Sequence, residues 1–117
     1  MADMKSYMLL LGGTGEGVAN MPQEAQDAHM DQWRTWFDKL GQEGVLLGGA
    51  PFSSESLLVK GKEKAVQSGH FAGSKELAFG GYIIIQADSE EAALNITKQC
   101  PTFELDGTIE VREITEM

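Results

Sequence analysis

Runs of apolar residues divide the chain into four main strands. An apolar run predicts a strand over residues 4–11, and a longer run predicts another over 79–87; both carry apolar residues on both faces. A shorter run predicts a strand over 45–50, which ends at a proline. Residues 108–114 alternate apolar and charged side chains, which predicts an edge strand with one solvent-facing side.

Apolar spacing of three and four residues predicts a helix from about Pro22 to Gly41, with Asn20 or Met21 preceding it. Its apolar stripe consists of Met30, Trp33, Phe37 and Leu40. A second helix is predicted to start after Asp88 as N-cap, with Glu91 capping reciprocally, and to stop at Pro101.

A charged turn over residues 61–64 separates two short apolar segments. This pattern predicts a β-hairpin with strands at 57–60 and 65–68, inserted between the second and third main strands.

The resulting order, β-α-β-(hairpin)-β-α-β, is the split β-α-β pattern of an α+β, ferredoxin-like fold. We expect a single domain over residues 1–117, with the first and third main strands at the centre of the sheet. Two helices cover only one face of such a sheet, so the second apolar face needs another cover. Burying an exposed apolar side chain stabilises by roughly 1.5–3 kcal/mol, and an identical sheet is the simplest cover. The pattern therefore predicts a homodimer packed sheet to sheet.

Composition narrows the possible partners. The 117 residues are 42% hydrophobic and 23% charged, which is typical of a folded globular domain. The 18 acidic against 9 basic residues give a net charge of −9, which disfavours binding to nucleic acid or to anionic membranes. The single cysteine excludes an intramolecular disulfide, and the N-terminus lacks a signal-peptide pattern. We expect a soluble cytoplasmic protein.

Several short runs match one known protein family as a set. These runs are Phe71-Ala72, Lys75-Glu76, Gly80-Gly81-Tyr82, Ala87-Asp88-Ser89, Glu91-Ala92, Cys100-Pro101 and Gly107 to Arg112. Over nearly its whole length the chain resembles the YCII-related (DGPF-type) family. The resemblance implies a dimeric α+β barrel. It implies little about activity, because most members of the family have no assigned function.

Some relatives look like small-molecule enzymes that use a His–Asp pair near the dimer cleft. The resemblance places the histidine of that pair at His29, whereas the position of the aspartate holds Cys100 here. The naming motif also differs, because Ser68 and His70 stand where Asp and Pro are usual, and Gly73 replaces a frequent acid. Because of these differences, the resemblance gives less support to a catalytic role carried over from relatives.

His29 lies four residues before Trp33, at the edge of the apolar stripe of the first helix. It could act as a general acid or base, or as a ligand-orienting donor; the alternative is an interior histidine bonded to backbone. His70, in the link after the hairpin, could bind a ligand or simply face solvent. A metal site made by these two histidines lacks any local ligand spacing, so we expect no metal and no cofactor.

Four further residues are weighed as ligand-binding candidates. Lys75 and Glu76 could bind a carboxylate or polar head group, or form an ordinary ion pair. Trp33 could stack on an aromatic ligand, as could Trp36 and Phe37 beside it, although aromatic residues at helical spacing more often belong to the core and we expect at least two of these three there. Tyr82 completes the set, as part of the matched glycine-glycine-tyrosine run.

Other notable residues are read structurally. Glu110 and Arg112 share one strand face, which favours a cross-strand or cross-subunit salt bridge over catalysis. Cys100 follows a predicted helix C-terminus, where a thiolate is disfavoured, so we expect it buried and inert. The glycine-rich run 12–17 lacks the third glycine and the immediate helix of a dinucleotide site.

Three functions follow from these residues. The first is a homodimeric small-molecule enzyme with His29 as acid or base on a polar, aromatic or carboxylate-bearing substrate. The alternative is a non-catalytic ligand-binding or regulatory dimer. A haem-binding oxygenase of the wider barrel superfamily is the weakest, because no clear axial-ligand context is present.

Overall fold

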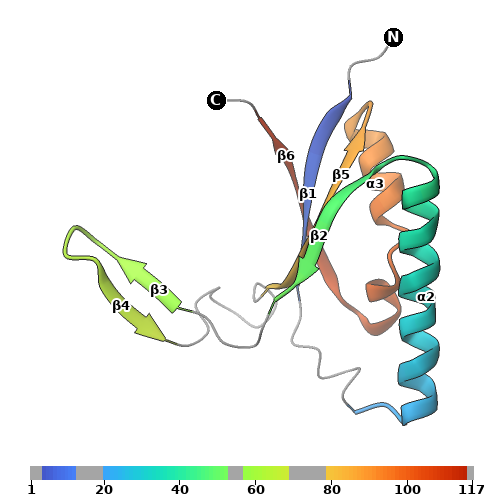
Figure 1. Cartoon of the computed structure of the whole chain (residues 1–117), viewed down its shortest axis with the longest axis horizontal. Helices are drawn as coiled ribbons and strands as arrows, with labels where there is room; N and C mark the ends of the chain where they lie inside the picture. Colours follow the sequence, from blue (N-terminus) through green and yellow to red (C-terminus); the bar gives the residue numbers. More distant parts are fainter. Residues whose placement is uncertain (1–3, 13–19, 53–56, 69–78, 116–117) are drawn as a thin grey trace.

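The described part of the chain contains six strands, two α-helices and one 3-10 helix (Figure 1). The computed structural model describes residues 4–12, 20–52, 57–68 and 79–115. The elements are β1 (Lys5–Gly12), α2 (Gln23–Gln42), β2 (Leu46–Pro51), β3 (Leu57–Lys60), β4 (Ala65–Ser68), β5 (Phe79–Ala87), α3 (Glu90–Thr97), η2 (Pro101–Leu105) and β6 (Thr108–Ile114). The predicted hairpin strands and the last two main strands are confirmed at the same residues.

The main sheet has four strands in the order β2-β5-β1-β6, and all its neighbouring pairs are antiparallel. The predicted central position of the first and third main strands, β1 and β5, is confirmed. This order, with its two helices, is the expected α+β ferredoxin-like fold. Strands β3 and β4 form a separate two-stranded sheet.

Both α-helices pack on the same face of the main sheet (Figure 1). Leu9 of β1 lies opposite Ile83 of β5 on one side and opposite Val111 of β6 on the other. The buried hydrophobic residues of this layer are Tyr7, Leu9, Trp36, Leu40, Ile83, Ile85, Ala87, Ala93 and Cys100. The alternation of β1 and β5 therefore points their odd-numbered residues toward the helices and their even-numbered residues away.

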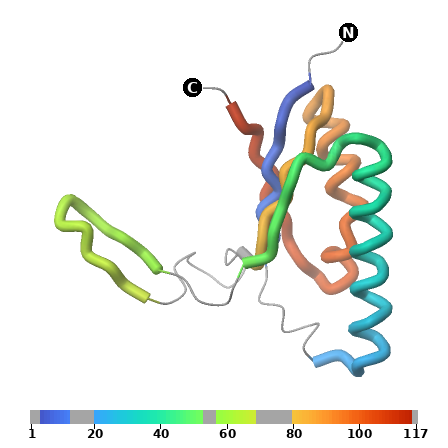
Figure 2. Tube along the Cα trace, viewed as in Figure 1, coloured from blue at the N-terminus to red at the C-terminus, as the bar shows by residue number. Residues whose placement is uncertain are grey.

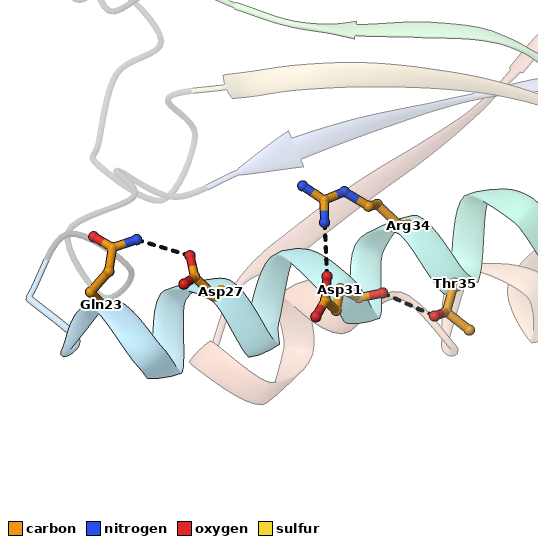
Figure 3. A network of polar contacts seen from close by, with 5 residues as sticks. All are labelled: Gln23, Asp27, Asp31, Arg34 and Thr35. Atoms are coloured by element: carbon orange, nitrogen blue, oxygen red, sulfur yellow. Dashed lines mark hydrogen bonds and ion pairs between the residues drawn. The ribbon is translucent and has the colours of Figure 1, made fainter.

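Helix α2 has a polar outer face and an apolar inner face. On the outer face, Gln23 donates to Asp27 at 2.9 Å, and Arg34 donates to the Asp31 carboxylate at 2.8 Å (Figure 3). Thr35 donates to the backbone carbonyl of Asp31 at 2.9 Å.

No helix in the described part of the chain is both long and apolar enough to span a membrane.

Helix α2 begins at Gln23, one residue after the predicted start at Pro22. Pro22 occupies the N-cap position and provides no side-chain cap. The Gln26 side chain donates to the Met21 carbonyl at 2.8 Å, a bond that holds the preceding residue against the first turn but caps none of the free N–H groups at the helix start.

The predicted N-cap of the second helix is wrong by one residue. Ser89, with extended backbone angles, is the N-cap of α3, and its hydroxyl accepts the Ala92 N–H at 3.1 Å. The third helical residue is therefore Ala92, so the predicted reciprocal cap between Asp88 and Glu91 does not form.

Helix α3 also ends earlier than predicted, at Thr97 rather than Pro101. Cys100 is extended, as the residue before a proline tends to be, and Pro101 starts the 3-10 helix η2. Pro101 suits this place because the first residue of a helix needs no N–H partner. Asp106 closes η2 in the left-handed conformation, and the Gly107 N–H donates to the Thr102 carbonyl at 3.0 Å.

The second face of the main sheet carries no helix in the described part of the chain (Figure 1). The even-numbered residues Met8, Leu10, Tyr82 and Ile84 lie on this face and are half-buried. We call these four residues the open sheet face.

Charged residues line the edge strand β6, as predicted. The expected salt bridge takes another form, because Arg112 pairs with Glu110 of its own strand at 2.6 Å. The pair that does join two strands is Lys5 with Glu113, at 3.6 Å and exposed.

Candidate functional site

His29 and Trp33 stand one turn apart on the inner side of α2 and contact each other. The indole Nε1–H of Trp33 donates to His29 Nε2 at 3.0 Å. The two rings meet edge to face, with centroids 6.3 Å apart and planes at 83°. His29 is only 7% exposed, which makes it one of two buried polar side chains in the described residues. The four-residue spacing seen in the sequence therefore produces a direct bond.

The bond from Trp33 decides where a neutral His29 carries its proton. Because Nε2 accepts the indole hydrogen, its lone pair is occupied and the imidazole proton sits on Nδ1. His29 can then offer Nδ1–H to an acceptor such as a carboxylate or carbonyl. While the Trp33 bond is intact, Nε2 is not free to take a proton from a substrate.

Three aromatic rings continue this site along α2 and form what we call the aromatic cluster: Trp33, Trp36 and Phe37. Trp33 lies 5.8 Å from Trp36 and 5.7 Å from Phe37, measured between ring centroids. Trp36 belongs to the buried core, and the other two pack against it. Of the three rings, therefore, one lies in the buried core, and the other two are partly buried beside it.

In the aromatic cluster, the indole N–H of Trp36 makes no hydrogen bond to the described residues. Trp36 is 5% exposed, and its Nε1 finds no partner among the described residues. A buried donor left without an acceptor costs about 1–3 kcal/mol. An acceptor on a water or a ligand would remove this cost, so Trp36 Nε1 is an unpartnered donor within the aromatic cluster.

Tyr82 lies apart from this site. It belongs to the open sheet face, whereas Trp33 packs on the helix side of the same sheet. Its neighbour is Phe52, with ring centroids 5.7 Å apart. The sequence pattern does not single out Phe52, whose only signal is its place directly after the proline that ends β2. The sheet separates Tyr82 from His29 and Trp33.

The other candidates lie outside the described residues: His70, Lys75 and Glu76, together with most of the glycine-rich run 12–17. In the part of the chain that is described, no group of three or more His, Cys, Asp or Glu side chains could hold a metal ion.

Cys100 is buried, as predicted. Burial raises the pKa of its thiol to about 11, against a smaller lowering by a hydrogen bond with the Thr102 backbone. A thiol that keeps its proton at neutral pH is a poor nucleophile. It also lacks the charge by which an aspartate at this position would orient a histidine.

Comparison with known proteins agrees with this architecture. The family model of the YCII-related domain matches residues 6–117, which is nearly the whole chain. None of the curated proteins compared with the chain is significantly similar to it. The chain therefore belongs to the YCII-related family.

Proposed function

We propose that the protein is a cytoplasmic homodimer that binds a small polar molecule near the interface between two main sheets. The observation that carries the proposal is the open sheet face, where Met8, Leu10, Tyr82 and Ile84 have no helix over them in the described chain. These side chains are only half-buried, and a second copy of the same face would complete their burial. Burying each of these half-buried side chains stabilises the dimer by less than the roughly 1.5–3 kcal/mol gained from a fully exposed apolar side chain. The contributions of the four side chains add up.

The dimer is tested by measuring mass in solution with light scattering after size exclusion. We expect twice the chain mass of 12.7 kDa. Ile84→Lys places a charge on the open sheet face and is expected to give the single-chain mass. Leu94→Lys is the matched control, because Leu94 is exposed on α3 and lies on the helix side. A wild-type chain that stays at the single-chain mass over a wide concentration range refutes the dimer.

For the ligand we propose a carboxylate or carbonyl compound that accepts a hydrogen bond from His29 Nδ1. The support is the His29–Trp33 bond, which leaves Nδ1–H as the available donor, and the aromatic cluster beside it. An aromatic carboxylate would satisfy both parts, with its ring against the cluster and its charge on the imidazole. In an enzyme, this Nδ1–H of the neutral imidazole could polarise a bound carbonyl, whereas delivering a proton as a general acid requires the imidazolium, whose Nε2–H is incompatible with the Trp33 bond. Trp33 is the proposed ligand-binding residue beside His29, and His70, Lys75 and Glu76 are further candidates. Tyr82, on the open sheet face, can join them only if the ligand reaches around an edge of the sheet.

The second candidate is a binding or regulatory dimer without turnover. It is favoured by one observation: the described residues give His29 an N–H donor as partner and no carboxylate. Catalytic histidines are usually oriented by a group that accepts their second proton. Trp33 instead donates a hydrogen to His29 and so occupies a lone pair of the imidazole.

The ligand proposal is tested by titrating the dimer with benzoate, phenylacetate and acetate while following the imidazole nitrogen signals of His29 by NMR. We expect a saturable shift of the Nδ1 signal with an aromatic acid, and its loss in His29→Gln. Absence of any saturable shift with all three acids contradicts the proposal. Turnover is examined in the same samples in heavy water by following exchange of the benzylic hydrogens of phenylacetate. Exchange requires a base, which His29 Nε2 can supply only after the Trp33 bond opens, whereas a protein that only binds the acid shows no exchange.

A further inference from the structure

The β3–β4 hairpin has one apolar face that nothing in the described chain covers. Its register pairs Leu57 with Ser68 and Val59 with Val66, so these four residues share a face. The exposed fractions are 74% for Leu57, 62% for Val59 and 63% for Val66. The opposite face carries Leu58, Lys60, Ala65 and Gln67.

The hairpin stands apart from the rest of the protein, on the side of the main sheet that has no helix (Figures 1 and 2). The radius of gyration is 16.0 Å, whereas a compact chain of this length has about 13 Å. A two-stranded hairpin is at best marginally stable alone in water. An exposed apolar face on such an element is typical of a surface that another molecule covers.

The distribution of charge between the hairpin and the rest of the chain indicates which molecule covers the apolar face of the hairpin. The hairpin contains Lys60, Lys62, Glu63 and Lys64, which give it a charge of +2. Because the whole chain carries −9, the remainder carries −11. A remainder with this charge repels nucleic acids and anionic membranes, but it attracts the basic hairpin of another copy.

The turn holds these lysines at the hairpin tip. Gly61 and Lys64 both have positive φ, at 74° and 57°, and the Lys64 N–H donates to the Gly61 carbonyl at 3.1 Å. Lys62 and Glu63 therefore lie at the tip, at the opposite end of the hairpin from the Leu57–Ser68 pair. A preformed turn loses less conformational entropy when its side chains meet a partner surface.

We propose that the hairpin is a dimerisation arm that packs its Leu57–Val59–Val66 face on the body of a second copy of this chain. This inference rests on the proposed homodimer and adds a second contact to it. Because the arm stands on the same side as the open sheet face, two chains that pack through that face bring each arm against the other body. The two arms are then related by the dimer axis, and the lysines of each tip meet carboxylates of the partner.

A pair of neighbouring substitutions tests the arm. Val66→Asp places a carboxylate on the apolar face, and Gln67→Asp places the same carboxylate on the opposite face of the same strand. Both residues are exposed, and both changes lower the net charge equally. Sedimentation equilibrium is expected to show a dimer dissociation constant at least tenfold higher for Val66→Asp than for Gln67→Asp. Circular dichroism melts of both variants should match the wild type under conditions where each is monomeric, because the arm lies outside the core.

Cross-linking gives a second readout that does not depend on affinity. Equal amounts of unlabelled and nitrogen-15-labelled chains are mixed and treated with a carbodiimide, which joins lysines to carboxylates in direct contact. Mass spectrometry is expected to find mixed-isotope links from Lys62 or Lys64 to acidic residues outside the hairpin. Lys62→Gln with Lys64→Gln should remove these links and weaken the dimer.

The outcomes separate this inference from the dimer proposal. A dimer that Ile84→Lys dissociates but Val66→Asp leaves unchanged, with lysine links only within one chain, overturns the arm and keeps the dimer. A wild-type chain that remains monomeric overturns both, including the case in which its hairpin binds vesicles of anionic phospholipid instead. Selective weakening by Val66→Asp together with mixed-isotope links from the tip supports the arm.

Discussion

The adjacent glycines at the start of β5 are expected to respond very differently to the same substitution. A Cβ built on Gly81 would lie 2.9 Å from the Ala50 carbonyl oxygen and 3.1 Å from the Pro51 Cα. Both atoms belong to the backbone of β2, so no side-chain rotation can relieve the contact. A Cβ on Gly80 meets only the Leu11 carbonyl oxygen, at the ordinary distance of 3.9 Å. Gly81→Ala should therefore push β2 away from β5, whereas Gly80→Ala should be accommodated.

The magnitude follows from the two contacts. Overpacking of one methyl group against a fixed neighbour costs typically 1–3 kcal/mol. Replacing a glycine where the new residue fits can instead stabilise by about 0.4–1 kcal/mol, because the unfolded chain loses freedom. Gly80 is not among the glycines with positive φ, so the second case applies to it. For 117 residues, each kcal/mol corresponds to about 4 °C in Tm, which predicts a fall of roughly 4–12 °C for Gly81→Ala.

Urea unfolding followed by circular dichroism measures both variants against the wild type at one fixed protein concentration, since a dimer's stability depends on it. We expect unchanged m values, a lower midpoint for Gly81→Ala, and an equal or higher midpoint for Gly80→Ala. Equal stability of the two variants would refute the reasoning, because it would mean that β2 yields to the added methyl group without cost.

Three further predictions concern single side chains. Ser89→Ala removes the hydroxyl that accepts the Ala92 N–H and should lower the free energy of unfolding by about 1 kcal/mol. Ser89→Asp keeps an acceptor and should lower it much less, and equal losses would argue against the cap. Trp33→Phe keeps the aromatic ring but removes the donor to His29, so nitrogen NMR should show the neutral imidazole changing from the Nδ1–H form alone to a mixture of tautomers; an unchanged spectrum contradicts the assignment. Burial raises the pKa of Cys100 from 9.0 to about 11, so the folded state holds this proton after the unfolded state has lost it. Stability should therefore fall between about pH 9 and 11, and less so in Cys100→Ala.

Much of the fold could be predicted because its strands follow simple patterns. The uninterrupted apolar runs of β1 and β5 mark strands that are central and apolar on both faces, and the register places them side by side. The alternation along β6 marks an edge strand in the same way. These patterns reflect burial, which acts on whole strands and tolerates small errors in their ends.

Helix ends were predicted less well because they depend on single hydrogen bonds. Asp88 and Ser89 are both good N-cap residues, and the choice between them depends on which one adopts extended angles before the first turn. Pro101 was rightly expected to be incompatible with a helix interior. The pattern does not show that α3 stops at Thr97 or that Pro101 starts a second, tighter helix, since both depend on how the chain returns to β6.

In the candidate site, the contact between residues could be predicted from their spacing, whereas the direction of the hydrogen bond could not. A four-residue step on α2 was enough to make His29 and Trp33 neighbours, but only the geometry shows that the indole donates and the imidazole accepts. For Tyr82 the sequence already contained the decisive signal, because it alternates with the buried Ile83 and so belongs to the opposite face of β5. A ligand that touches both Tyr82 and the His29–Trp33 pair must therefore reach around an edge of the sheet, because two chains packed through the open sheet face still leave each His29 on the far side of its own sheet. The dimer proposal and the ligand proposal can therefore be tested apart: a variant of the open sheet face that dissociates the dimer should change binding at His29 only if the ligand also reaches the partner around that edge.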